Sequence, residues 1–223
     1  LYFWTHNSPL ANYVYDNDDY AAYNATGGMG TKAPNLGVNN SIPNGSIASG
    51  QGFMVRGTAT GKATFTNAMR RTTGNTQFFR MANPVTAATE NPTIIEKSRI
   101  WLDISNEQGA FKQTLIGYVD GATNDYDNAF DGELLGGNTI SIYSILGDQL
   151  LSIQGRAVPF NTTDKVPLGY KSEIDGGFTI SIEATDGVFV DQEIYLEDKL
   201  LNIVYDLKAA PYNFQTVAGT FDD

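Results

Sequence analysis

The 223-residue chain carries 14 basic and 25 acidic side chains, a formal net charge of −11, and no cysteine. The missing cysteine excludes thiol nucleophiles, thiolate zinc sites and disulfide frameworks. The acidic excess repels phosphates, so we expect neither nucleic acid nor an anionic membrane surface as a partner. We expect no membrane insertion, because no apolar run approaches the ~18 residues of a spanning helix. The first residues lack the features of a signal peptide, which favours a mature or excised segment.

Short β-branched and aromatic runs alternate with clusters of Gly, Asn and Asp along most of the chain. This spacing predicts an all-β fold, an antiparallel β-sandwich of the jelly-roll or immunoglobulin-like kind, with long loops and little helix. We expect one domain over residues 1–223, because the segments on either side of the proline-containing stretch 82–96 look too short of strands to close separate cores.

The first 45 residues predict a loop-rich N-terminal edge, since they are rich in Asn, Asp, Tyr and Gly and show little alternation. Within this edge, Asp18 is a candidate cap for a short helix over Asp18–Ala25. Two strands are expected next, over Ile47–Arg56 and Lys62–Phe65. In the first of these, Gly50 and Gly52 favour a bulge or a close backbone approach.

Strands dominate the second half of the chain. In Arg99–Ile104 the apolar residues recur with a period of two, and the turn after it predicts an antiparallel return over Phe111–Val119. Further strands are expected in a second hairpin and in a C-terminal group: Thr139–Ile145 with Gln149–Gln154, then Phe178–Ile182, Glu193–Glu197 and Leu201–Asp206.

An acidic loop, residues 120–131, is the candidate calcium site. Five side-chain oxygen donors fall within it: Asp120, Asn124, Asp125, Asp127 and Asp131. Calcium takes roughly six to eight oxygen ligands, to which backbone carbonyls of a glycine-containing loop can contribute. The spacing does not match an EF-hand, and the alternative is an Asx-rich turn whose side chains cap its own backbone.

A tyrosine patch near the N-terminus is the candidate sugar site. It combines aromatic rings that can stack on a pyranose with carboxylates that can accept hydroxyl protons, and its residues are Tyr13, Tyr15, Asp16, Asp18, Asp19 and Tyr20. The alternative is that these tyrosines pack over the core with their hydroxyls in water.

Catalytic signatures are weak. His6 is the sole histidine, which excludes histidine-based zinc sites, and Ser49-Gly50 lacks the spacing of a nucleophile elbow. With 25 acids, some carboxylate pair will have a workable separation by chance, so paired acids do not indicate glycoside hydrolysis. We therefore expect no catalytic residues.

Several strings, read in order, resemble a known type of segment: WTHNSPL, IPNGSIASGQGFMVR, NTQFFR, RIWLDISNEQGAFKQTLIGYVDGATNDYD, IQGRAVPF, VPLGY and IYLED. Together they are similar to the β-rich segment that precedes the C-terminal sorting domain of the type IX secretion system in large secreted proteins of Bacteroidetes, notably flavobacteria. The resemblance covers nearly the whole chain. It implies export to the outer cell surface or the medium through the type IX machinery.

The sequence thus favours a non-catalytic structural or adhesive module of a secreted or cell-surface protein. Two alternatives stay open: a calcium-supported carbohydrate-binding module that contacts a surface or environmental polysaccharide, and a polysaccharide-degrading enzyme domain.

Overall fold

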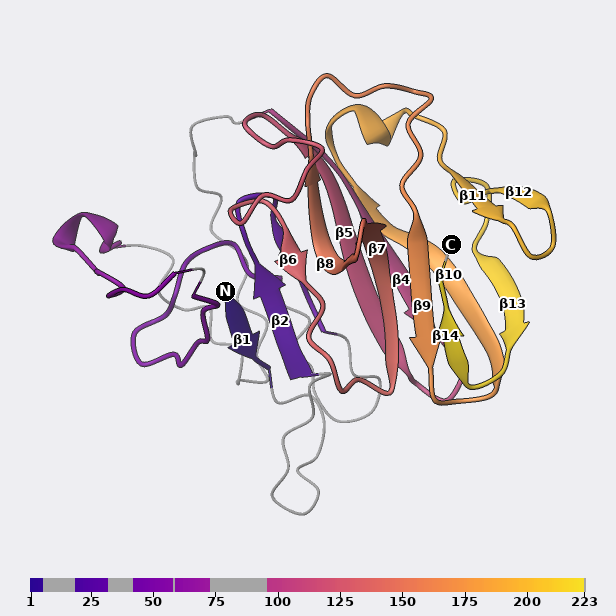
Figure 1. The fold of residues 1–223 in the computed structure, drawn as a ribbon, viewed down its shortest axis with the longest axis horizontal. Helices are drawn as coiled ribbons and strands as arrows, with labels where there is room; N and C mark the ends of the chain where they lie inside the picture. The colour runs from indigo at the N-terminus through magenta and orange to yellow at the C-terminus, as the bar shows by residue number, and fades with distance from the viewer. Residues whose placement is uncertain (6–18, 32–41, 58, 73–95, 223) are drawn as a thin grey trace, which may run out of the picture.

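A curled sheet forms the body of the computed structural model, which describes residues 1–5, 19–31, 42–57, 59–72 and 96–222 (Figure 1). The order along its main path is β13-β10-β4-β5-β8-β7-β9-β14, and β6 pairs with β8 beside that path. The strands are β4 (Lys97–Ser105), β5 (Phe111–Val119), β6 (Gly132–Glu133), β7 (Ile140–Leu146), β8 (Gln149–Arg156), β9 (Leu168–Ser172), β10 (Gly176–Thr185), β13 (Tyr212–Thr216) and β14 (Gly219–Phe221).

The sheet folds over so that its two ends meet. Strands β13 and β14 are consecutive in the chain, yet they lie at opposite ends of the strand order. The Tyr170 ring on β9 packs edge-on against Phe214 on β13, with 5.3 Å between centroids, and its hydroxyl lies 3.0 Å from that of Thr216. In Figure 1, β7, β8 and β9 accordingly lie in front of β4, β5 and β10. The fold is therefore the all-β sandwich that the sequence predicts.

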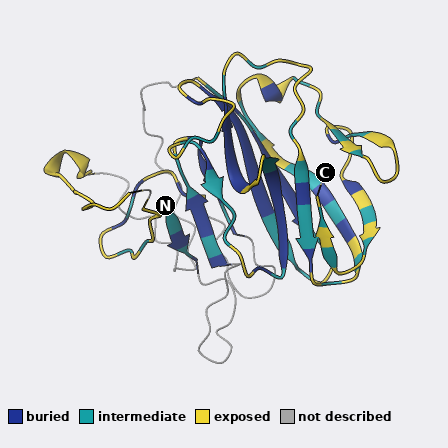
Figure 2. Ribbon diagram, in the orientation of Figure 1, coloured by how far each residue is buried: buried dark blue, intermediate teal, exposed yellow. Residues whose placement is uncertain are grey.

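Apolar side chains from both layers fill the space between them. Ile140 and Ile142 of β7 belong to one buried cluster with Ile104 of β4 and with Phe178 and Ile180 of β10. These residues come from the alternating positions of their strands, which is why a period-two pattern identifies them. Figure 2 shows the buried residues concentrated in these central strands.

A second, three-stranded sheet covers the outer face of the main sheet. Its strands are β1 (Tyr2–Trp4), β2 (Tyr20–Tyr23) and β3 (Gly28–Met29). Trp101 is the contact point: it packs in one buried cluster with Ala22, Met29, Leu115 and Ile153, and its indole N–H donates to the carbonyl of Gly28 at 2.8 Å. Strand β4 is therefore buried on both faces.

Among the strands that the structure describes, one pair is parallel and the others are antiparallel. Strands β5 and β8 run parallel, with Leu115 opposite Ile153 and Tyr118 opposite Arg156. The antiparallel sandwich that the sequence predicts thus contains one parallel pair in its described part. A separate hairpin of β11 (Tyr195–Asp198) and β12 (Ile203–Asp206) lies at the other side of the molecule and is mostly exposed (Figures 1 and 2).

Three predicted elements are wrong. Tyr20–Tyr23 of the expected helix is strand β2, because pairing with β1 and β3 overrides the local preference. In the expected strand Ile47–Arg56 only Met54 forms a bridge, to Tyr2, and Gly50 turns the chain with a φ of 84°. Lys62–Phe65 is not a strand.

The remaining predicted strands are confirmed within a few residues, whereas the described parts of the N-terminal edge contain strands that the sequence did not predict. Its described parts contribute β1, β2 and β3 and the buried side chains of Phe3 and Ala21. The sequence also failed to predict β6, β9, β13 and β14. Most of the predicted loop 82–96 lies outside the described residues.

Candidate functional site

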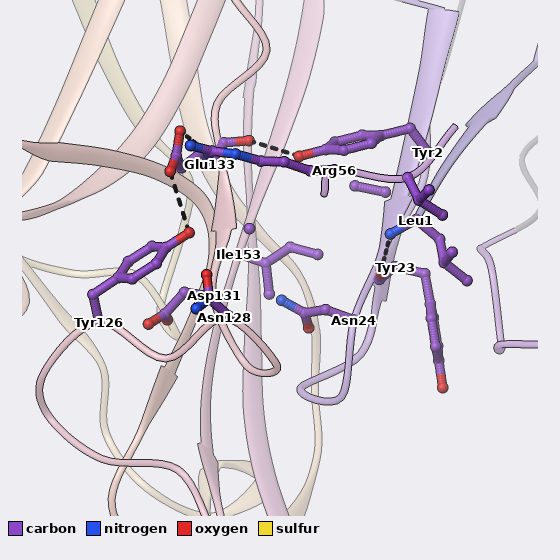
Figure 3. A pocket seen from close by; sticks show the side chains of 13 residues that line it. Leu1, Tyr2, Tyr23, Asn24, Arg56, Tyr126, Asn128, Asp131, Glu133 and Ile153 are labelled. Atoms are coloured by element: carbon purple, nitrogen blue, oxygen red, sulfur yellow. Dashed lines mark hydrogen bonds and ion pairs between the residues drawn. The ribbon is translucent and has the colours of Figure 1, made fainter. Parts of the chain in front are cut away.

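A pocket of about 220 Å³ lies where the N-terminal sheet meets β6 and the acidic loop (Figure 3). Its lining comes from five parts of the chain, far apart in sequence: Leu1, Tyr2, Ala22, Tyr23, Asn24, Val55, Arg56, Tyr126, Asn128, Asp131, Gly132, Glu133 and Ile153. Ala22 and Ile153 also belong to the buried cluster around Trp101, so apolar core side chains form part of the wall.

Glu133 gathers the polar side chains of the pocket. The Tyr126 hydroxyl donates to Oε1 of Glu133 at 3.2 Å, and Arg56 forms an ion pair with Oε2. The Tyr2 hydroxyl donates to the backbone carbonyl of Glu133, also at 3.2 Å. Figure 3 shows Tyr2 and Tyr126 reaching Glu133 from different sides, with Ile153 in the space between them and Asn24 below. One β6 residue thus fixes three neighbours.

The loop that carries Tyr126 is fastened to the strands behind it. The Asn24 amide and the Thr26 hydroxyl both donate to the carbonyl of Phe130, each at 2.7 Å. Asp131, which is 5% exposed, accepts from the backbone N–H of Asp127 at 2.6 Å and from that of Gly155 at 2.9 Å. These bonds tie the loop to the β2–β3 turn and to β8.

Burial raises the pKa of three acidic groups that line the pocket, the Asp131 carboxyl and the phenols of Tyr2 and Tyr126. Burial raises the pKa of the Asp131 carboxyl, and the two backbone N–H groups that it accepts from offset part of that rise. Burial likewise raises the pKa of Tyr2 and of Tyr126, and in Tyr126 the Glu133 carboxylate adds to the rise. Both tyrosines are therefore neutral hydrogen-bonding groups at physiological pH.

The acidic loop uses its side-chain oxygens as caps. Besides Asp131, Asp127 accepts from the N–H of Thr123 at 2.6 Å, and Asn124 accepts from the N–H of Ala157 at 3.2 Å. Asp120 and Asp125 are exposed. In the part of the chain that the structure describes, no three His, Cys, Asp or Glu side chains come together as a metal-ligating group. The geometry favours the Asx-turn alternative, and the calcium site stays a prediction.

The tyrosine patch is placed only in part. Tyr13, Tyr15, Asp16 and Asp18, together with His6, lie outside the described residues. Asp19 is 2% exposed, and its backbone carbonyl accepts from the N–H and hydroxyl of Thr5, both at 2.7 Å. Tyr20 lies in β2 opposite Trp4. The sugar site at these residues therefore stays a prediction.

Of the site residues that the sequence predicts, Asp131 alone lines the pocket. Long-range pairing brings the lining residues together: the bridge between Tyr2 and Met54 places Arg56 near Tyr2, and the pairing of β6 with β8 positions Glu133. The available signal was compositional: Asn, Asp and Tyr are dense in two segments, residues 13–24 and 124–131. That signal predicts polar loops but not which loops meet.

Comparison with known families adds one finding. A family model described as a domain of unknown function, DUF8693, matches residues 1–223. The chain belongs to this family. Neither the curated proteins nor the solved structures give a significant match to this family member. The described residues contain no helix with the length and hydropathy needed to span a bilayer.

Proposed function

We propose that this DUF8693 member is a non-catalytic structural or adhesive module of a protein that the type IX secretion system delivers to the cell surface or the medium of a Bacteroidetes bacterium. The resemblance of its strings to segments that precede type IX sorting domains supports the route of export. The arrangement of its carboxylates supports the structural role.

The observation that carries the proposal is that three carboxylates, those of Asp103, Asp164 and Asp222, join separate strands and loops of the fold. Asp164 accepts from the Tyr118 hydroxyl at 2.5 Å and from two guanidinium nitrogens of Arg156, each at 3.0 Å. Asp103 on β4 accepts from the Gln113 amide on β5 at 2.7 Å, and Asp222 accepts from the Tyr143 hydroxyl at 2.6 Å. A general acid or base needs a face that is free for substrate. The oxygens of these three carboxylates instead accept hydrogen bonds that stabilise the fold.

The alternative function, a polysaccharide-degrading enzyme domain, is tested by measuring turnover. The purified chain is incubated with a panel of neutral, acidic and sulfated polysaccharides, and reducing ends are counted over time. We expect no product release. Sustained release that one carboxylate substitution abolishes would contradict the non-catalytic assignment and favour a degrading enzyme.

The route of export is tested in cells. The parent protein is tagged within this segment in a flavobacterium, and surface exposure is measured by protease shaving and antibody labelling. We expect surface or medium signal in the wild type and periplasmic retention when the type IX translocon is disrupted. Surface signal that survives this disruption would overturn the assignment of the route.

A further inference from the structure

We propose that the pocket between β2, β6 and the acidic loop binds one neutral pyranose ring, at the end or at a branch of a polysaccharide. The inference rests on the adhesive half of the proposed function and assigns it a place and a ligand class. It concerns a different set of residues from the tyrosine patch expected from sequence.

The size of the pocket limits the ligand. Sites for drug-sized molecules usually enclose roughly 300–1,000 Å³. The volume here is about 220 Å³, which suits a single small ring and excludes an extended oligosaccharide. The rest of a bound glycan would therefore lie in solvent.

The walls of the pocket combine aromatic and apolar surfaces with polar edges. Tyr2 and Tyr126 lie on different sides of Glu133 (Figure 3), and Ala22 and Ile153 contribute apolar surface. A pyranose has the matching character, with C–H faces that pack on apolar or aromatic groups and hydroxyls around its rim. Tyrosine is suited to such a ligand because its ring is apolar while its hydroxyl stays polar.

The polar groups retain hydrogen-bonding capacity after their mutual contacts. A carboxylate has about four acceptor sites and a guanidinium has about five N–H donors. The bond from Tyr126 and the ion pair with Arg56 use only some of the acceptor sites of Glu133, and the ion pair uses only some of the donors of Arg56. Arg56 keeps 54% of its side-chain surface exposed, and the exposed Asn128 adds an amide to the lining. Sugar hydroxyls, which both donate and accept, can use donors and acceptors placed side by side.

Charge decides between neutral and acidic sugars. Arg56, the one Lys or Arg side chain of the lining, is already paired with Glu133, the Leu1 ammonium already donates to the Tyr23 carbonyl, and Asp131 lies in the same wall. The whole chain carries a formal charge of −11. A uronic acid would gain no unpaired cation and would meet an acidic surface, so the neutral ring is favoured.

The pocket is held before any ligand arrives. The loop bearing Tyr126 is fixed by the bonds from Asn24 and Thr26 to the Phe130 carbonyl and by the buried Asp131. A site whose side chains are already positioned loses less conformational entropy on binding. The loop's role as a support and the pocket's role as a binding site are therefore consistent.

The test is a titration of the whole chain with methyl glycosides of glucose, galactose and mannose and with methyl glucuronide, followed by ligand-observed NMR and calorimetry. We expect at least one neutral glycoside to bind in preference to the glucuronide. Replacing Tyr126 with alanine or Arg56 with methionine should weaken that binding at least tenfold. The matched control is Tyr195→Ala, since Tyr195 is 55% exposed on the distant β11 hairpin and should leave binding unchanged.

Three results would overturn the inference: no binding of any neutral glycoside, equal binding by Tyr126→Ala and wild type, or preference for the glucuronide. Far-UV circular dichroism and the melting temperature verify that each variant is folded. Tyr126→Phe removes only the hydroxyl and serves if the alanine variant fails to fold, with weaker binding expected. If the chain binds none of these glycosides, the sugar-binding inference is wrong but the proposed structural role is not contradicted. Polysaccharide turnover, in contrast, would contradict the proposed function itself.

Discussion

Arg99 and Asp186 are 87 residues apart in sequence and joined by two hydrogen bonds, from Nε at 2.9 Å and from Nη2 at 2.5 Å, both to the same carboxylate oxygen. The Arg99 guanidinium also lies 4.7 Å from the ring centroid of Trp101, and its Nη1 donates to the carbonyl of Thr26 at 3.3 Å. One side chain on β4 thus contacts the chain just beyond β10 and the segment between β2 and β3.

We expect Arg99→Ala to lower the free energy of unfolding by about 1–3 kcal/mol, because a partly exposed ion pair contributes up to ~1 kcal/mol and the cation–π contact and the Thr26 bond add to it. Urea denaturation measures the change. Lys171→Ala is the control: its pair with Glu173 is more exposed, so the loss should stay below about 1 kcal/mol. Equal effects of the two substitutions would contradict the joining role of Arg99.

Gly155 on β8 permits the close approach of the acidic loop. A Cβ at this position would lie 2.5 Å from the Cβ of Phe130 and 2.8 Å from the Thr26 hydroxyl oxygen, both well inside van der Waals contact. Gly155→Ala should therefore push the loop away and destabilise the fold by about 1–3 kcal/mol. Gly52→Ala is the matched control, because no atom lies within 4 Å of a Cβ at that position. This substitution should change the free energy of unfolding by no more than about 0.5 kcal/mol. Chemical denaturation of both variants measures the two changes in the free energy of unfolding and shows whether position 155 tolerates a Cβ.

The strands were predictable where the pattern is local, and the site was not, because it is formed by long-range pairing. The period of two in Arg99–Ile104 correctly gave the alternation of Ile100, Leu102 and Ile104. It could not show that Trp101 on the opposite face would be covered by residues near the N-terminus. Likewise β6 is only two residues long, and β8 supplies the pairing that makes Gly132–Glu133 a strand.

The calcium prediction is tested on the acidic loop itself. Because Asp127, Asp131 and Asn124 already accept backbone N–H groups, we expect the melting temperature to be the same in millimolar calcium and in EDTA. Differential scanning calorimetry provides the measurement, and magnesium provides the control for ionic strength. A calcium-specific rise that Asp125→Asn abolishes would instead establish the loop as a metal site, since ligand binding to the folded state raises stability.

Tyr118 gives the chain a specific sensitivity to alkali. Burial, and then the hydrogen bond to the Asp164 carboxylate, raise the pKa of this 4% exposed phenol far above its ordinary value. In the unfolded chain a tyrosine ionises near pH 10. Above that pH the unfolded state binds fewer protons than the folded state, so stability falls as pH rises, while below it the full contribution is present.

In Tyr118→Phe there is no phenol to ionise, so we expect a shallower loss of stability above pH 10, by up to about 1.4 kcal/mol per pH unit. At neutral pH the same variant should be less stable than wild type by about 1.5–3 kcal/mol, because Asp164 loses a hydrogen bond to its charged oxygen. Urea midpoints measured from pH 7 to 11 would show the two curves converging. Parallel curves would mean that Tyr118 ionises as readily in the fold as in the unfolded chain, contrary to its burial beneath Phe160 and Phe189.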